Sequence, residues 1–300
     1  MRLVRESWKQ LRKNRIATVG AAIVLVLVLA AILAPVIAPF DPYEANLKEA
    51  LESPSLRHVM GTDYLGRDIF SRVLYGARIS LQVGVLAELI SLAIGISVGA
   101  IAAHYRGWVD QSLMRIADMF FAFPTALFAM AVIAVFEEPS ITKIFIVLGI
   151  VNWAGVARLV RGSVLSIKER EFAEAARALG VRPRRLVVRH LLPNALAPVL
   201  VAATIGVAGN ILTEAWLSFL GLGAQAPLAS WGSMITNGQP FIYTKPWICL
   251  CPGLAIVVTV LGFNLFGDGL RDILDPRLAR TTSCVQGAGR GCRAARPRRG

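Results

Sequence analysis

The 300-residue chain has few charged residues and few cysteines for its length. Charged residues make up 17% of it and hydrophobic residues 55%, with a mean hydropathy of +0.59. An ordinary soluble domain is about 25% charged. The four cysteines give no disulfide framework, because Cys249 and Cys251 fall within an apolar run and Cys284 and Cys292 within a basic tail. The composition excludes an ordinary soluble domain and indicates a membrane protein.

The sequence also lacks the patterns that bind nucleotide phosphates or metals. None of its lysines follows a glycine, so the phosphate-binding pattern Gly-x4-Gly-Lys-Ser/Thr is absent. His58, His104 and His190 lie in separate polar segments without the spacing of a zinc site. His58 could bind a cation together with Asp63 and Asp68, but a loop of solvated polar residues is the stronger expectation. We therefore expect no metal, no cofactor and no enzymatic activity on this chain.

Long apolar runs are what the chain has instead. A membrane-spanning helix needs about 20 apolar residues, and six segments meet this requirement. We predict an all-α membrane protein with six transmembrane helices. The first run is uncharged from Ile16 to Phe40, longer than the core of a secretory signal, and is read as a retained helix. The expected spans are 16–38, 80–103, 114–136, 142–161, 194–221 and 247–267.

The basic residues lie in blocks between these runs, which predicts an orientation in the membrane rather than nucleic-acid binding, despite a net charge of +13. Seventeen Lys and Arg residues lie in the amino-terminal tail, near the turn after the second span, and between residue 158 and the end of the insert that follows the fourth span. Seven lie on the opposite side. The positive-inside rule therefore predicts that both termini are cytoplasmic.

The polar insert between the fourth and fifth spans, 163–193, is the most informative segment. Ser166 and Glu169 have the spacing of a capping box, which predicts a helix over 167–179. Gly180 is expected to end that helix and Pro183 to begin a second, basic one. A helix lying on the membrane surface would be rich in Lys and Arg opposite bulky apolar residues. The predicted helix is acidic and then alanine-rich, which favours a docking element for a soluble partner.

The insert resembles the EAA loop of ABC importer permeases. It reads Glu174-Ala175-Ala176, with Gly180 four residues later and Leu192-Pro193 beyond. Further stretches make the chain similar to permeases of dipeptide, oligopeptide and nickel importers, of the subunit type with Gly-Thr-Asp-x-Leu-Gly-Arg-Asp before the second span. The resemblance covers roughly residues 5–278, and its stretches include 61–68, 107–110, 189–194, 217–223 and 267–272.

The resemblance implies a type I ABC importer permease-like bundle in the cytoplasmic (inner) membrane. It implies two ATP-binding subunits that carry ATP and Mg, and an extracytoplasmic substrate-binding protein. One six-helix subunit is too small to enclose a peptide-sized pore, so we expect a heterodimer with a related permease. Cargo would be di- or oligopeptides, with nickel or another small solute as the alternative, and a secondary transporter or channel as a more remote one. The implied ATPase-coupling residues are Glu174, Ala175, Ala176, Leu179, Gly180 and Pro193.

The expected organisation is a cytoplasmic tail (1–15), a first helix (16–38), an external loop with an interfacial helix (39–79), a five-helix core (80–278) and a basic low-complexity tail (279–300). In the external loop, an amphipathic stretch from Asp68 to Tyr75 should place Arg67 and Arg72 in water. The tail departs from the family, as does His104-Tyr105-Arg106, where a glycine-rich turn is expected.

Three acids fall within the apolar spans, where a charge is costly. Glu88, Asp118 and Glu214 are therefore candidates to line the transport pathway or to pin helices together, and pinning is favoured. Small residues allow helices to approach closely in membranes. We expect such contacts at Gly84, Gly95, Gly99, Gly206 and Gly209.

Overall fold

The computed structural model describes residues 14–136, 140–225 and 227–274. Cys284, Cys292, residues 1–13 of the predicted tail 1–15, the predicted tail 279–300 and the end of the permease core lie outside these residues. Most of the described residues are helical, and the only bridge of strand type among them joins Thr62 and Asp68. The all-α prediction is confirmed for this part of the chain.

Five helices are long and apolar enough to cross a membrane, and a bent pair makes a sixth span if counted as one. The long helices are α2 (Arg15–Ile37), α3 (Ile69–Tyr105), α6 (Ile141–Lys168), α9 (Leu192–Phe219) and α11 (Trp247–Leu274). Shorter elements connect them: η1 (Leu47–Glu49), α7 (Glu171–Ala178), α8 (Pro183–Leu186), the π-helical turn η2 (Val187–Leu191), α10 (Trp231–Gly238) and η3 (Gln239–Phe241).

The third predicted span, 114–136, is not one straight helix. It is divided into α4 (Gly107–Phe121) and α5 (Thr125–Ala134), which meet at an angle of 85°. Pro124 lies at the break as the N-cap of α5. A proline disfavours helical geometry in the residue before it and cannot donate its own backbone hydrogen bond. The apolar composition predicted a span but could not show this bend.

The second span begins earlier than predicted. The amphipathic stretch that was expected to lie along the interface forms the first turns of α3, which starts at Ile69 rather than near residue 80. Asp68 caps this helix, because its Oδ2 accepts a hydrogen bond of 2.8 Å from the backbone N–H of Ser71. The expectation that Arg67 and Arg72 face water is wrong, since only 7% and 2% of them are exposed.

Small residues allow α3 to pack closely against α6 and α9. A methyl group at Gly95 would lie 2.5 Å from Val156 Cβ, and one at Gly84 would lie 2.6 Å from Ile211 Cγ1. The close contacts predicted at Gly84, Gly95 and Gly99 are therefore present, and Gly206 likewise adjoins a side chain of α3. Gly209 has open space beside it, so the prediction is wrong at that position.

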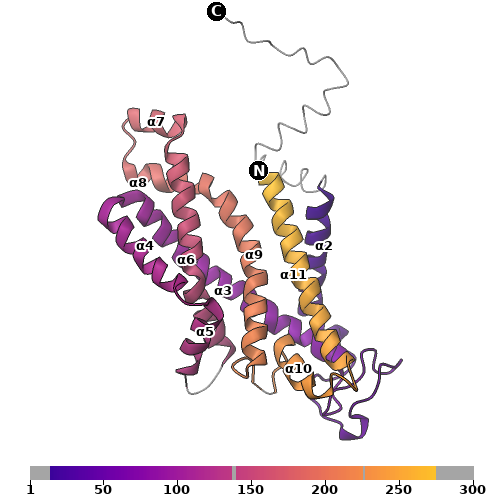
Figure 1. Ribbon diagram of the computed structural model, residues 1–300. Helices are drawn as coiled ribbons and strands as arrows, with labels where there is room; N and C mark the ends of the chain where they lie inside the picture. The colour runs from indigo at the N-terminus through magenta and orange to yellow at the C-terminus, as the bar shows by residue number, and fades with distance from the viewer. Residues whose placement is uncertain (1–13, 137–139, 226, 275–300) are drawn as a thin grey trace, which may run out of the picture.

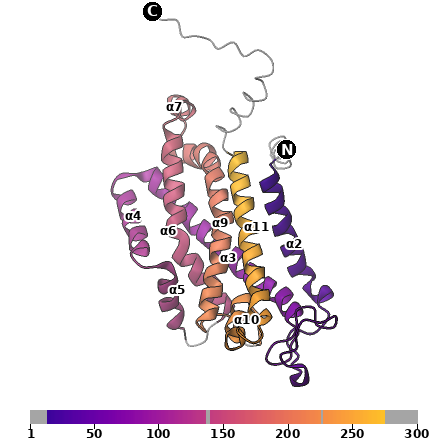
Figure 2. The same ribbon diagram turned by 45° about the vertical axis from the view of Figure 1, so that its right-hand side comes forward.

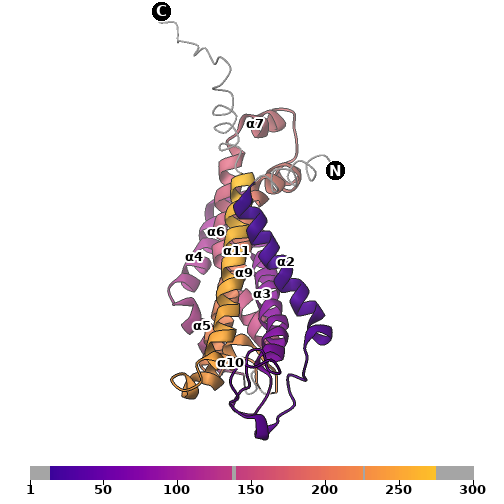
Figure 3. The same cartoon turned by 90° about the vertical axis from the view of Figure 1, so that its right-hand side faces the viewer.

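The bundle has two distinct ends (Figures 1 and 2). One end carries α7 and α8 together with the beginning of α2 and the end of α11. The other end carries α10 and the folded connection between α2 and α3. Viewed from the side, α7 stands clear of the long helices (Figure 3). A short helical element thus projects from one end of an apolar bundle.

Candidate functional site

The insert folds as two short helices at the end of α6, and its details differ from the prediction. The expected helix over 167–179 is shorter, because α6 continues to Lys168 and α7 spans only Glu171–Ala178. Ser166 is therefore inside α6, and α7 has no side-chain cap, so the capping box is wrong. The apolar register of α6 continues through the buried Ile167, and this packing extends the helix past the polar signal.

The carboxyl end of α7 has the predicted glycine geometry. Gly180 has a φ of +78°, the left-handed conformation that favours glycine. Its backbone N–H donates to the carbonyl of Arg177 at 2.9 Å, and that of Val181 donates to the carbonyl of Ala176 at 3.1 Å. These two bonds form a Schellman motif, which satisfies the last carbonyls of the helix. The glycine therefore fixes where α7 ends and the direction of the chain beyond it.

Arg177 ties α7 to the end of α6. Its Nε donates to the carbonyl of Ala173 at 3.2 Å, and its Nη2 donates to the carbonyl of Lys168. A guanidinium can serve several acceptors at fixed angles. The carbonyl of Lys168 belongs to the last turn of α6, where no intrahelical donor is available. The Arg177 side chain thus stabilises the turn between α6 and α7.

One face of α7 is buried and the other is open. Ala173 is fully buried in an apolar cluster with Val164, Ile167 and Leu186. The rest of the α7 surface carries charged and alanine side chains together with Phe172, which is 43% exposed. Leu179, at the end of the helix, is 85% exposed. Beside it lies an open cavity of about 800 Å³ whose lining includes Leu179, Gly180, Arg182, Arg184, Arg185 and His190. The helix therefore packs on the bundle mainly through Ala173 and presents most of its remaining surface outward.

The residues expected at the coupling surface are brought together, with one exception. Glu174, Ala175, Ala176, Leu179 and Gly180 all lie on α7 or its cap, and all but the half-buried Ala176 are exposed. Pro193 is also exposed, but it lies in the first turn of α9, beyond α8 and the π-helical turn. It positions the start of α9 rather than adding to the α7 surface.

Two of the three candidate acids lie buried between α3 and α9. The Glu88 carboxylate accepts a 3.0 Å hydrogen bond from Asn210, whose side-chain oxygen accepts one of 2.7 Å from Asn152. Glu214 accepts hydrogen bonds from Ser80 at 3.1 Å and from Ser218 at 2.7 Å. Both acids thus connect α3 and α9, and Asn152 extends the first network to α6.

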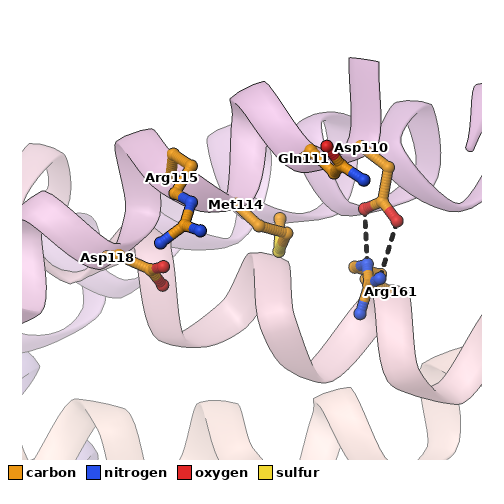
Figure 4. A pocket seen from close by; sticks show the side chains of 6 residues that line it. All are labelled: Asp110, Gln111, Met114, Arg115, Asp118 and Arg161. Carbon is orange, nitrogen blue, oxygen red and sulfur yellow. Dashed lines mark hydrogen bonds and ion pairs between the residues drawn. The ribbon is translucent and has the colours of Figure 1, made fainter. Parts of the chain in front are cut away.

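The third acid, Asp118, lies in a different environment. Its side chain is 45% exposed and pairs with Arg158 of α6. Near the start of α4, Asp110 accepts two hydrogen bonds from Arg161, with distances of 2.5 and 2.6 Å (Figure 4). The two pairs join α4 to α6 across a cavity of about 230 Å³. Sequence reasoning missed them because both arginines were counted as loop charges.

The loop before α3 is folded around buried charges, and was wrongly expected to be solvated. His58, Asp63 and Asp68 are at most 6% exposed. His58 Nδ1 lies 2.9 Å from Asp68, and Arg67 Nε donates to Asp63 at 2.8 Å. No group of three or more possible metal ligands occurs among the described residues. The i, i+4 spacing of Asp63 and Arg67 was the available signal for this pairing.

Comparisons with known proteins agree with the architecture. The profile of the family described as "Binding-protein-dependent transport system inner membrane component" matches residues 95–280. Residues 2–54 match the "N-terminal TM domain of oligopeptide transport permease C". Solved structures of the MetNI methionine ABC transporter in inward-facing conformations are similar in fold, with a TM-score of 0.55 at 21% identity over 68% of this chain and 96% of that chain.

Full-length relatives carry the match across most of the sequence. The chain is 47% identical to the dipeptide transport system permease protein DppC of Alkalihalophilus pseudofirmus over 91% of this chain and 90% of that protein. It is 42% identical to the oligopeptide transport system permease protein OppC of Bacillus subtilis, over 93% of this chain and 91% of that protein. The glutathione transport system permease protein GsiD of Pectobacterium atrosepticum is 40% identical, over 91% of each chain.

These relatives are named as transport permeases, and none of the names describes an enzyme. A multi-pass helical bundle, an inner-membrane family profile and relatives of 40–47% identity thus agree along nearly the whole chain. The chain belongs to the ABC importer permeases of the dipeptide, oligopeptide and nickel transport family, as a transport subunit of the cytoplasmic membrane rather than an enzyme.

Proposed function

We propose that this permease moves di- or oligopeptides inward and is driven by a separate ATPase that docks on α7. The observation that carries the coupling proposal is the geometry of α7. It projects from the bundle, is anchored through Ala173 and Arg177, and ends in a fixed Schellman turn. Four of the eight residues of α7 are alanines, and such small side chains let another surface approach closely. Such a helix can transmit a push or pull to α6 and α8, to which it is joined.

In this proposal α7 faces the cytoplasm, as do both chain termini. The charge distribution supports this orientation, because the basic residues of the insert lie at the end of the bundle that carries α7. The folded 39–68 segment and α10 then face the outside. The ATPase subunits bind ATP and Mg, since this chain carries no phosphate-binding loop. A substrate-binding protein delivers cargo to the outer end, and a related permease completes the pore as a heterodimer.

ATP binding would bias the permease between inward-open and outward-open states. The buried networks of Glu88 and Glu214 suit a pinning role in this change, because each joins α3 to α9 and each acid is satisfied by amide or hydroxyl donors. Asp118 is exposed and paired with Arg158, which favours a tie between α4 and α6. We assign none of the three to contact with cargo.

Peptide cargo is favoured over nickel or another small solute by the names of the relatives, which include dipeptide, oligopeptide and glutathione permeases. Dipeptides, oligopeptides and the tripeptide glutathione all contain amide bonds and a carboxylate. The described residues also hold no cluster of three metal-ligating side chains that would suit a nickel pathway.

Co-purification tests the docking proposal. Tagged wild-type permease is expected to retain an ATPase with phosphate-binding loops, and Glu174→Lys to lose it, because the substitution reverses a charge on the exposed face of α7. Glu169→Lys is the matched control: the residue is also exposed and lies in the same insert, but just beyond the end of α6 and outside α7. Equal retention by wild type and Glu174→Lys would contradict docking on α7. Equal loss in both variants would show a general charge effect instead.

A further inference from the structure

A polar cavity lies at the end of the bundle opposite α7. Its volume is about 250 Å³, and it opens between the 64–67 turn, the end of α9 and α10. It has no acidic side chain in its lining. The polar side chains that line it include Arg67, Arg72, Ser218 and Asn237.

The two arginines are nearly buried, yet most of their donors are unused. Asp63 Oδ2 lies 2.8 Å from Arg67 Nε and 3.6 Å from Arg72 Nε, so this carboxylate meets the inner edge of both guanidinium groups. Arg72 Nη1 donates to the carbonyl of Pro42 at 2.7 Å. A guanidinium has five N–H donors. Neither the Nη atoms of Arg67 nor Nη2 of Arg72 hydrogen-bonds to a described residue.

These unused donors are not sealed inside the protein. The buried side-chain atoms that have no hydrogen-bond partner among the described residues are His58 Nε2, Ser91 Oγ and Trp247 Nε1, and no arginine nitrogen is among them. The terminal nitrogens of Arg67 and Arg72 therefore reach open space, and the cavity is the space that both side chains line. A nearly buried cation with free donors is stabilised by an anion that fills the adjoining cavity.

The charge and shape of this wall fit a carboxylate. Two arginines and one nearby aspartate leave one excess positive charge, which matches a monoanion better than a phosphate dianion. The planar guanidinium fork pairs with the two oxygens of a carboxylate. The cavity is smaller than the roughly 300–1,000 Å³ of sites that enclose whole drug-sized ligands. It has room for a carboxylate and the residue that bears it.

We propose that this cavity seats the C-terminal carboxylate of an incoming peptide at the outer end of the permease. The choice of a peptide and of the outer side rests on the proposed function. The guanidinium groups of Arg67 and Arg72 would donate to the carboxylate. Asn237 lies exposed at the rim, and Ser218, already bonded to the buried Glu214, lines the same cavity next to the end of α9.

The test places a negative charge in the cavity without changing its size. Asn237→Asp is nearly isosteric, and Asn237 has no hydrogen bond to a described residue that the change would break. Gln239→Glu is the matched control, because it adds the same charge two residues away at an exposed position outside the lining. Uptake would be measured in proteoliposomes holding the complete importer, with a free-acid dipeptide and its C-terminal amide. A separate arm would measure equilibrium binding of N-acetylglycine and N-acetylglycine amide to the purified complex.

A carboxylate seat predicts that Asn237→Asp raises the KM for the free-acid peptide about tenfold, through like-charge repulsion, and leaves the KM for the amide unchanged. Gln239→Glu should leave both unchanged. N-acetylglycine should bind to wild type and to Gln239→Glu, but not to Asn237→Asp, and its amide should bind to none.

Equal loss of uptake for both peptide forms in Asn237→Asp would overturn the proposal, because the cavity would then contact a protein partner rather than the substrate. No binding of N-acetylglycine to wild type would overturn it as well. Binding of N-acetylglycine that is lost in Asn237→Asp, without any peptide uptake by wild type, would support the carboxylate seat and reject the peptide cargo of the proposed function.

Discussion

Replacing Gly180 by alanine isolates the backbone geometry of the α7 cap from its surroundings. A Cβ atom at this position would meet nothing within 4 Å, so the added methyl group itself costs no steric clash. The whole cost comes from the φ of +78°, which is unfavourable by about 1–2 kcal/mol for an L residue with a side chain. A change of this size shifts a local equilibrium by roughly 5- to 30-fold. The equilibrium between the open and the closed Schellman turn should therefore shift toward the open form by this factor.

The assay is the ATPase activity of the complete importer in the presence of its substrate-loaded binding protein. Membrane insertion and co-purification of the ATPase subunits are measured in parallel. Gly180→Ala should lower ATPase retention and coupled activity several-fold while leaving insertion unchanged, because Ala173 still anchors α7. Gly180→Asn should recover much of the activity, since asparagine tolerates the left-handed conformation better than alanine.

Gly162→Ala is the matched control. Gly162 lies inside α6, also with open space around the position of a Cβ, and it does not have a positive φ. Alanine there should be neutral or stabilising by about 0.5–1 kcal/mol. The reasoning would be refuted if Gly180→Ala coupled as well as wild type, or if Gly162→Ala were equally impaired.

Three other predictions follow from burial and contact. Gly206→Ala would put a methyl group 2.3–2.7 Å from the buried carboxylate of Glu88. By displacing the hydrogen bond of that carboxylate, it should lower the free energy of unfolding in detergent by about 1 kcal/mol. Gly209→Ala, with open space around it, should have no such effect, and equal effects of the two variants would exclude this cause. Ala173→Leu should destabilise the insert through overpacking and increase its proteolysis, whereas Ala175→Leu should leave proteolysis unchanged and weaken ATPase binding; the reverse pattern would contradict the assignment of the two faces. Asp110→Asn should lower thermal stability by about 1–3 kcal/mol, because it weakens a partly buried pair with α6, and an unchanged melting temperature would show that the pair contributes nothing.

The sequence predicted features that depend on local chemistry. Apolar length predicted the spans, and a glycine after an alanine-rich helix predicted the left-handed turn at Gly180. Features that depend on tertiary packing were not predictable in this way. Ser166 does not begin a helix despite its capping-box pattern, because the buried face of α6 continues past it. The bend at Pro124 divides a span at an angle that amino-acid composition cannot predict.

Charges were the least predictable part of the candidate site. The amphipathic spacing around Arg67 and Arg72 predicted that both side chains face water. They are buried instead, because a folded loop covers them, and the sequence alone does not show this loop. Glu88 and Glu214 were recognised as costly charges, but their partners are up to 134 positions distant along the chain. Only the three-dimensional arrangement shows which groups satisfy them.

Uptake of a labelled dipeptide into proteoliposomes tests the central claim, coupling through α7, most directly. The vesicles would contain this chain, a related permease, the ATPase subunits and the binding protein. Wild type should accumulate the peptide only when ATP is present, and Glu174→Lys should be inserted in equal amount but fail to accumulate it. Wild-type accumulation by Glu174→Lys, or accumulation by wild type without the ATPase subunits, would contradict the claim.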